Sequence, residues 1–467
     1  MRVLGCLAIL AFLLVAGCAK PSATSGASSS TEAAASGVPE PGTPAAQSLA
    51  QNQANEPRPA LVAPKILTPV LVGSPGAAEP NIAIAPDGTL YASNPCAIWR
   101  SEDHGVSWRE TKHTGQTGCG DGDIAVDGAG NLYWLGLGTG IPFQVSTDRG
   151  ESFSKAVDLS DGTGNDREWI DSTPAGKIYT AWRGAGGIEF NASPDGGATW
   201  SGKVVAGPDG DGGPVVHDPV SGMLYLPVVD LGPALGTTTA TVHVHTSTDQ
   251  GATWSHHDTA TLPTFPVEPN AYNSDFPVIA VDSAGTAFLV YSAPLAWPRV
   301  PVAATPPEEA NLFGIYLQTS TDHGATWSAP RLVSAPDKDA RMPWIAAGKA
   351  GRVAVVWYEN VNGVPGEVLP DQWNVMLWES VTADQETPVG QTVKLTPTPN
   401  HVGSLCTSGT GCAAADRSLL DYFEVAITAE GQPVAVWSSS ILGTGVGVAV
   451  QGTDVYFGGL ADGTPLR

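Results

Sequence analysis

Residues 320–327 read Ser-Thr-Asp-His-Gly-Ala-Thr-Trp, and this stretch decides the fold because it recurs. Four more copies of the pattern S-x-D-x-G-x-[TS]-[WF] lie upstream, at residues 101–108, 146–153, 193–200 and 247–254. The aspartate can accept hydrogen bonds from turn N–H groups, the glycine can adopt positive φ, and the aromatic residue can pack on a neighbouring sheet. We therefore interpret each copy as a hairpin corner with a structural, non-catalytic aspartate. These aspartates are Asp103, Asp148, Asp195, Asp249 and Asp322.

A second repeat surrounds the first. Seven times, an apolar strand is followed by a glycine turn and by a second strand rich in Tyr, Trp and Val. A third strand and usually a fourth come next. This order predicts an all-β protein with a single seven-bladed β-propeller of four-stranded antiparallel blades. The seven strand pairs begin at Asn81, Asp123, Glu168, Pro214, Asp275, Arg341 and Asp421.

The two ends of this repeated region are expected to meet. The strand at residues 65–72 has no blade of its own, and the last blade has strands near residues 421–427, 432–438 and 446–450. If the early strand pairs as the outer strand of the last blade, the ring closes and loses its exposed edges. A six-bladed ring with an irregular C-terminal appendage is the alternative.

The five copies of the eight-residue pattern resemble the Asp box, or BNR repeat, of the sialidase-like β-propellers. The resemblance extends over about residues 65–467 and implies that residues 61–467 form one propeller domain. A shared fold does not establish a shared activity. Whether the protein is an enzyme therefore stays open at this point.

The N-terminus has the features of an export signal. Met1 and Arg2 precede the apolar residues 3–15, a run too short for a stable membrane span. Residues 14–18, Leu-Val-Ala-Gly-Cys, resemble the lipobox of bacterial lipoproteins. This resemblance implies a signal peptide at residues 1–17, acylation of Cys18, and the outer membrane as destination if the host has one. An ordinary secretory signal is the alternative.

Composition describes the next segment and limits the partners. Residues 18–60 contain mainly Ala, Ser, Pro, Gly, Thr and Gln, so we expect a disordered, lipid-anchored linker there. The chain has 22 Lys+Arg against 46 Asp+Glu, a net charge of −24. This charge argues against a nucleic-acid binder and against docking on anionic lipid through protein charge. We expect a monomer.

Four cysteines remain in the exported domain, an even number that suits an oxidising compartment. Cys406 and Cys412 enclose a short loop and are expected to pair. Cys96 and Cys119 could form a second disulfide if the chain between them doubles back. The spacings do not match a zinc site, so we expect the bridges to staple long loops.

Three histidines form a weaker pattern. His243 and His245 share one face of a strand, and His256 should lie nearly opposite, so that the three could hold a metal ion. Surface histidines on an outer hairpin are the commoner outcome. We therefore expect no metal and no cofactor.

Long connections are expected on the face opposite the Asp boxes, where binding or catalysis usually occurs on a rigid scaffold. Their aromatic residues could stack on sugar rings or on a peptide, or could simply pack the connections down. The connections are residues 231–240, 256–274, 292–311, 359–374 and 397–420. The aromatic residues are Phe265, Tyr272, Trp297 and Trp373.

The resemblance also offers a catalytic alternative. Sialidases have six blades, bind the substrate carboxylate with three arginines and use a Tyr nucleophile polarised by a Glu. The Arg-Ile-Pro-like motif of their first blade is missing here, because residues 79–82 read Glu-Pro-Asn-Ile. The candidate residues are Arg167, Arg341 and Arg417 for the carboxylate, Tyr422 as nucleophile, and Glu168 or Glu424 as its base.

Two hypotheses follow. The first is an extracytoplasmic, cell-envelope lipoprotein whose propeller binds a carbohydrate or a protein on its long-loop face. The second is an exo-sialidase-like glycoside hydrolase that cleaves terminal acidic sugars. Three arginines converging on one point near Tyr422 would favour the enzyme, whereas arginines paired with carboxylates would favour the binding protein.

Overall fold

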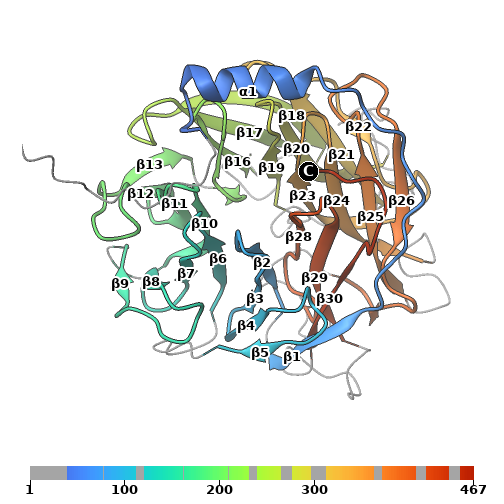
Figure 1. Ribbon diagram of the computed structural model, residues 1–467, viewed down its shortest axis with the longest axis horizontal. Coiled ribbons are helices and arrows are strands. Elements are labelled where there is room, and N and C mark those ends of the chain that lie inside the picture. Colours follow the sequence, from blue (N-terminus) through green and yellow to red (C-terminus); the bar gives the residue numbers. More distant parts are fainter. Residues whose placement is uncertain are drawn as a thin grey trace, which may run out of the picture. The chain divides into compact units, whose positions relative to one another are not determined.

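The structure, a computed structural model, describes residues 39–76, 78–111, 120–160, 162, 164–208, 210–230, 239–263, 276–295, 312–361, 371–405, 417–440 and 453–467. All of them lie in the unit formed by residues 36–467. Their strands form seven antiparallel sheets arranged around a common axis (Figure 1). This is a seven-bladed β-propeller, as the seven strand pairs predict, and the six-bladed alternative is wrong.

The first three blades have four strands each, and the first strand of each blade lies nearest the axis (Figure 1). Blade 1 contains β2 (Asn81–Ile84), β3 (Leu90–Asn94), β4 (Ala97–Ser101) and β5 (Arg109–Glu110). Blade 2 contains β6 (Gly122–Val126), β7 (Leu132–Gly136), β8 (Pro142–Ser146) and β9 (Val157–Asp158). Blade 3 contains β10 (Asp166–Ser172), β11 (Ile178–Gly184), β12 (Gly187–Ser193) and β13 (Val204–Gly207).

The next three blades follow the same order with small variations. Blade 4 contains β14 (Asp211–Gly212) and β15 (Val216–His217), which both pair with β16 (Leu224–Asp230), then β17 (Thr239–Ser247) and β18 (Ser255–Pro263). Blade 5 contains β19 (Val278–Val281), β20 (Ala287–Pro294), β21 (Phe313–Ser320) and β22 (Arg331–Leu332). Blade 6 contains β23 (Ala340–Ala347), β24 (Val353–Asn360), β25 (Gln372–Ser380), β26 (Gly390–Lys394) and the short β27 (His401–Val402).

Blade 7 is built from both ends of the repeated region. Its strands run in the order β28 (Glu424–Ile427), β29 (Pro433–Ser439), β30 (Thr453–Gly459) and β1 (Val70–Gly76). Val70 pairs with Phe457, and Ile66 forms an isolated bridge with Leu460. The predicted closure is confirmed, and it leaves β30 paired on both sides instead of exposed. The third strand of the blade is at residues 453–459, whereas we predict it near 446–450, which lie outside the described residues, and the early strand begins at Val70 instead of Lys65.

The strands are apolar on both faces because each blade packs on two neighbours. Residues 353–358 of β24, for example, are Val-Ala-Val-Val-Trp-Tyr and are fully buried. All eight residues of β20 are buried as well. Short continuous apolar runs of this kind are typical of strands covered on both sides. The core is therefore a series of interfaces between blades.

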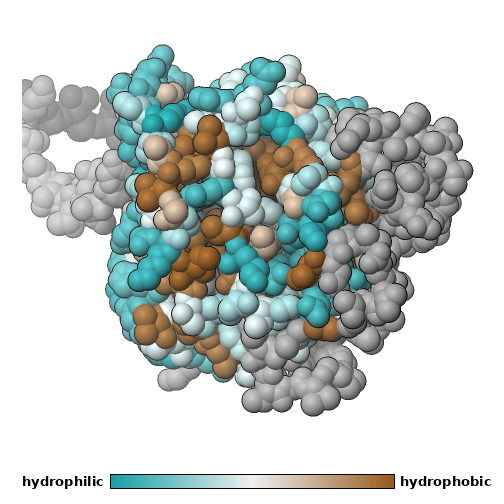
Figure 2. Space-filling model, turned by 90° about the vertical axis from the view of Figure 1, so that its right-hand side faces the viewer, coloured by the Kyte–Doolittle hydropathy of each residue, from teal (hydrophilic) through white to brown (hydrophobic). Residues whose placement is uncertain are grey.

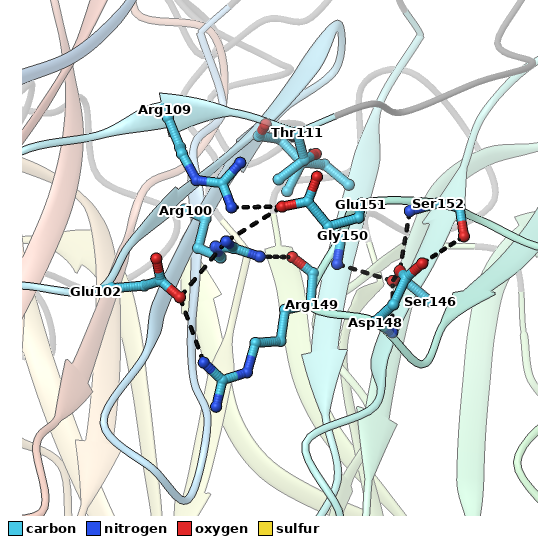
Figure 3. A network of polar contacts seen from close by, with 11 residues as sticks. Arg100, Glu102, Arg109, Thr111, Ser146, Asp148, Arg149, Gly150, Glu151 and Ser152 are labelled. Carbon is cyan, nitrogen blue, oxygen red and sulfur yellow. Dashed lines mark hydrogen bonds and ion pairs between the residues drawn. The ribbon is translucent and has the colours of Figure 1, made fainter.

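The five Asp boxes form hairpin corners with the same hydrogen bonds. Figure 3 shows the second box, where Asp148 Oδ1 accepts from the Ser152 backbone N–H at 2.9 Å and from the Ser146 hydroxyl at 2.8 Å. The Gly150 N–H donates to Ser146 Oγ at 2.8 Å. Arg149 and Gly150 both have positive φ, 62° and 80°. The aspartate bonds recur in the other four boxes, so each carboxylate is engaged by its own turn.

The aromatic residue of a box packs on the preceding blade. Trp108 of the first box contacts Phe457 of blade 7, with ring centroids 5.4 Å apart. Trp200 of the third box contacts Phe143 of blade 2 in the same way, with ring centroids 5.0 Å apart. Such aromatic pairs stabilise a contact beyond the area they bury, so the boxes connect neighbouring blades.

Charged residues reinforce the contact between blades 1 and 2 (Figure 3). Arg100 on β4 donates to the Arg149 carbonyl oxygen and lies 3.3 Å from Glu151. The Arg149 guanidinium lies 3.3 Å from Glu102. The second box is therefore tied to blade 1 through its backbone and two of its side chains.

The segment before the ring is partly structured, which corrects the disordered linker predicted for residues 18–60. Helix α1 (Pro44–Ala54) begins at Thr43, whose hydroxyl accepts from the Ala46 N–H at 3.3 Å, and Pro44 suits its first position. The apolar content of this segment was too low to predict this helix. Across the described part of the chain, no helix combines the length and the apolarity that a membrane span requires.

Residues 39–69, which we call the strap, run from α1 past the outer edge of blade 6 to β1 (Figure 1). Hydrogen bonds and ion pairs attach the strap to blades 4, 6 and 7. They join Gly42 to Val220, Glu56 to Lys349, Arg58 to Asp384, Val62 to both Thr464 and Gln391, and Lys65 to Asp462. The strap therefore belongs to the folded unit.

The side of the ring at β25 and β26 shows apolar residues in separate patches between polar ones (Figure 2). The most exposed apolar side chains there, Val62 and Val389, are single residues. Scattered apolar residues of this kind are ordinary on a protein surface. This side gives no reason to expect a docking surface.

The direction of the strands determines which face of the ring carries the long connections. The inner strands run toward the Asp-box face, so their N-terminal ends lie on the opposite face, which we call the loop face. The strand ends that flank residues 231–238, 264–275, 296–311 and 362–370 all lie on the loop face, as predicted. Those connections themselves lie outside the described residues.

Candidate functional site

Charged residues from four blades meet where the inner strands begin, on the loop face. We call Glu79, Asp121, Arg167, Arg417 and Asp421 the axial cluster. Arg167 on β10 of blade 3 donates to Asp421, which precedes β28 of blade 7. Blades 1 and 2 lie between these two blades, so the contact crosses the axis of the ring.

Asp421 is the centre of the axial cluster. Its buried carboxylate accepts from both Arg167 and Arg417, with Arg417 Nη2 at 2.9 Å. Burial would raise the pKa of Asp421, but the two guanidinium charges outweigh burial and hold this pKa below its ordinary value. Arg167 also lies 4.0 Å from Glu79 and 3.7 Å from Asp166.

Burial raises the pKa of the other buried carboxyl groups of this region. Burial, together with the charges of Asp121 and Asp421, raises the pKa of Glu79 well above its ordinary range. Burial also raises the pKa of Asp121, and that of Asp211 to about 7. A protonated carboxyl group can donate a hydrogen bond as well as accept one, and raised pKa values favour this form.

Glu168 is buried beside the axial cluster. Its side chain is 1% exposed, and neither carboxylate oxygen bonds to another described residue. Burial and then the charge of Asp121 raise the pKa of Glu168 well above its ordinary value. These surroundings disfavour the ionised carboxylate that a base would need.

Backbone strain marks the same region. Outside the Asp boxes, the described non-glycine residues with positive φ are Glu79, Arg167, Met342 and Leu420, at 54–63°. All four lie at or just before the start of an inner strand, and the register of β10 and of β23 is interrupted beside two of them. Strained backbone of this kind often occurs at functional sites and aims particular side chains.

The three predicted arginines do not form one anion site. Arg167 and Arg417 share the Asp421 carboxylate, whereas Arg341 donates to Asp339 at 3.1 Å. The Arg341 guanidinium also lies 3.5 Å from the ring centroid of Phe313 in blade 5. Arg341 therefore belongs to the contact between blades 5 and 6, and each of the three arginines is already paired with a carboxylate.

Tyr422 does not have the surroundings of a nucleophile. Its hydroxyl donates to the Gly122 carbonyl oxygen at 3.2 Å. Its ring packs against those of Trp169 and Trp344, with centroids 4.9 and 5.6 Å away. Burial raises its pKa well above the ordinary value, so the phenolate is disfavoured. Together with Phe276, these rings fill the centre of the propeller below the axial cluster.

Glu424 connects two blades instead of polarising Tyr422. Its carboxylate accepts from the Ile82 backbone N–H of blade 1 at 2.9 Å. Asp123 makes the corresponding bond to the Ile170 N–H of blade 3 at 2.9 Å. The sialidase-like arrangement of arginines, tyrosine and base is therefore not formed.

Most of the predicted loop residues and cysteines lie outside the described residues. This applies to Phe265, Tyr272, Trp297, Cys119, Cys406 and Cys412, so both disulfides stay predictions. Cys96 is described, in the turn between β3 and β4. Trp373 was proposed as a stacking surface, but it is 1% exposed and donates to the Gly403 carbonyl oxygen at 3.0 Å. It is a core residue.

A hollow with a volume of about 440 Å³ lies near the axis of the ring, at the end of the inner strands that faces the Asp boxes. It is lined mainly by apolar residues near the ends of the inner strands, such as Val216, Val281 and Ala347. Its acidic residues Asp123 and Glu424 accept backbone N–H groups, and Asp171 accepts from the His217 backbone N–H and lies 2.7 Å from His217 Nδ1.

Sequence reasoning grouped Arg167 and Arg417 with carboxylates at the starts of the inner strands, but it did not include Glu79 and Asp121. A signal exists, because an acidic residue stands just before or at the start of many inner strands. Glu79, Asp121, Asp166, Asp211 and Asp421 are examples. The spacing of this signal follows the blades, but only the closed ring brings the residues together.

The comparison with known families agrees with the fold. The BNR/Asp-box repeat matches residues 318–329, which contain the fifth box. This match and the seven antiparallel blades decide the assignment. The chain is an Asp-box β-propeller. No curated protein is matched by its sequence.

The chain is also similar to several solved structures, at low sequence identity. An α-L-arabinanase from Penicillium chrysogenum with bound arabinobiose is 15% identical, with a TM-score of 0.43 over 86% of this chain and 99% of that chain. An ulvan lyase is 14% identical, with a TM-score of 0.48 over 84% and 96%. YCF48 bound to D1 peptide is 12% identical, with a TM-score of 0.48 over 87% and 100%.

Proposed function

We propose that the Asp-box propeller binds a neutral carbohydrate on its loop face, at the axial cluster. The observation that carries this proposal is the convergence of ionisable side chains from four blades in this cluster, with both arginines already paired to Asp421. Two partly exposed members of the cluster, Asp121 and Arg417, form its rim together with the neighbouring Asp166, which lies 3.7 Å from Arg167.

The charges of the axial cluster favour a neutral ligand over an acidic sugar. Arg167 and Arg417 already share the Asp421 carboxylate, so a carboxylate ligand would have to compete with Asp421 for both guanidinium groups. Sugar hydroxyls, in contrast, donate to carboxylates and accept from guanidinium groups and protonated acids. The site is therefore suited to a polyhydroxyl compound.

The proposal predicts that Asp166→Ala weakens carbohydrate binding about tenfold, because one hydrogen bond to a charged group is worth about 1.5–3 kcal/mol. Asp166 has 43% of its side chain exposed at the rim. Isothermal titration of the full-length protein with neutral oligosaccharides measures this change. Reducing-end release in the same samples would reveal hydrolysis.

Asp337→Ala is the matched control for this experiment. Asp337 is an exposed aspartate before β23 on the same face, and it is not part of the axial cluster. We expect unchanged affinity for Asp337→Ala. Preference for sialylated over neutral glycans, equal losses in both variants, or binding only to a protein would contradict the proposal.

We also propose that the protein is an extracytoplasmic lipoprotein anchored through Cys18. The sequence at residues 14–18 supports this proposal. We expect Cys18→Ser to move the protein from the detergent phase to the aqueous phase in a Triton X-114 partition. Cys6→Ser is the control, because this cysteine would leave with the signal peptide. Detergent-phase Cys18→Ser protein would rule the anchor out.

A further inference from the structure

We propose that blade 4 carries a Zn²⁺ site formed by His243 on β17 and by His256 and Asp258 on β18. Sequence analysis noted the two histidines but missed Asp258, and it expected no metal. The site lies on the outer hairpin of its blade (Figure 1), away from the axial cluster. This proposal is independent of the proposed carbohydrate site.

The register of the hairpin brings the three side chains together. His243 pairs with Asp258, and His245 pairs with His256, so all four residues share one face of the two strands. Asp258 Oδ1 lies 2.8 Å from His243 Nδ1 and 2.7 Å from His256 Nε2. One ligand atom from each of the three residues lies within 4.8 Å of the others. Two imidazole nitrogens therefore point at one carboxylate oxygen.

This donor set suits Zn²⁺, which binds histidine nitrogen and carboxylate oxygen at about 2.0–2.2 Å in tetrahedral geometry. Ligand atoms of such a site are about 3.3 Å apart, so the two nitrogens and the oxygen would separate by about 0.5 Å. His256 and Asp258 have side chains 47% and 70% exposed, which leaves them room to move. His243 is nearly buried and supplies the fixed ligand.

A second carboxylate supports the site from behind. Asp230 Oδ2 on the neighbouring strand β16 lies 3.7 Å from His243 Nε2, the nitrogen that would not bind the metal. Histidine ligands commonly direct their second nitrogen to a carboxylate, which orients the ring and raises its basicity. The position of the Asp230 carboxylate behind His243 is an independent observation, and it distinguishes this group from a chance cluster of surface histidines.

The three protein ligands leave one coordination position for water or an external ligand. Because β18 is the outer strand of blade 4, the ion would also connect the edge strand to β17. Binding that occurs only in the folded state raises thermal stability. Zinc is therefore expected to raise the melting temperature of the protein.

Isothermal titration of the metal-free, full-length protein with zinc chloride at pH 7.5 tests the site. We expect one zinc per chain bound at this hairpin, and at least tenfold weaker binding there in His256→Ala. His257→Ala is the matched control, since His257 is the next residue of the same strand, faces the other side and lies 3.2 Å from Thr246 Oγ1. Its zinc affinity should equal that of the unchanged protein.

Cobalt supplies a second readout. Co²⁺ in the same site should give the visible absorption of a four-coordinate complex, and Asp258→Asn should weaken it. Circular dichroism confirms that the variants fold, which their exposed positions favour. Zinc affinity unaffected by His256→Ala, or reduced equally by His257→Ala, would overturn the proposal, as would the absence of any binding.

Discussion

Replacing Arg167 with Met is expected to lower the free energy of unfolding by about 3–5 kcal/mol at pH 7.5, the range for breaking a buried ion pair from one side. Arg167 is buried and offsets Asp421, Glu79 and Asp166. Its removal leaves these carboxylates close together without their shared counter-charge. Urea denaturation followed by circular dichroism measures the loss.

The loss in free energy of unfolding caused by Arg167→Met should become smaller as the pH falls toward 5. A carboxyl group whose pKa is higher in the folded than in the unfolded protein favours folding at low pH, and this stabilisation is lost as the pH rises toward the folded pKa. The pKa of Glu79 is already raised by burial, and loss of Arg167 raises it further. At lower pH the group is protonated in both proteins and needs no counter-charge.

Arg183→Met is the control for this prediction. The Arg183 side chain is 36% exposed and lies 3.9 Å from Asp211. A partly exposed pair at this distance contributes at most about 1 kcal/mol. Equal losses for the two arginines, or a deficit of Arg167→Met that does not change with pH, would show that the axial cluster is not held together by charge.

Replacing Gly105 with Ala in the first Asp box is expected to destabilise the protein by about 3 kcal/mol. Gly105 has φ +87°, and a Cβ there would lie 2.1 Å from Phe457 Cε1 of blade 7. The left-handed conformation costs about 1–2 kcal/mol for alanine, and forcing a methyl group into a packed contact adds about 1–3 kcal/mol. Differential scanning calorimetry should show a lower melting temperature.

Gly88→Ala separates the two contributions. Gly88 lies in the β2–β3 turn of the same blade with φ +86°, but a Cβ there meets nothing within 4 Å. We expect this variant to lose only the conformational part, about 1–2 kcal/mol. If the two variants lose the same stability, the contact between the box and blade 7 contributes little.

The repeat determined most of the fold before any coordinates were considered. Each box contains its own turn, because Asp148 is engaged by residues within four positions of it. Seven strand pairs of the same pattern then leave little choice but a ring, although the connections between them vary in length, and the unpaired early strand supplies its closure. The turns and strand pairs depend on hydrogen bonds between residues that are close in the sequence, so the sequence pattern predicts them.

The strap shows where local information was insufficient. Residues 44–54 contain few large apolar residues, and composition alone predicts disorder. Their helix is attached at its two ends by contacts with blades 4 and 6, through Gly42 and Glu56. Only the folded ring supplies these partners.

The sequence by itself determined the propeller, its closure and the face that carries the long connections. The tertiary structure alone decided how the charged residues pair. Arg167 and Asp421 are 254 positions apart, yet they meet across the axis, whereas Arg341 turns to Phe313 in another interface. The physical reason is that a charge selects its partner by distance in space and by burial, and neither quantity is encoded in the spacing of one repeat.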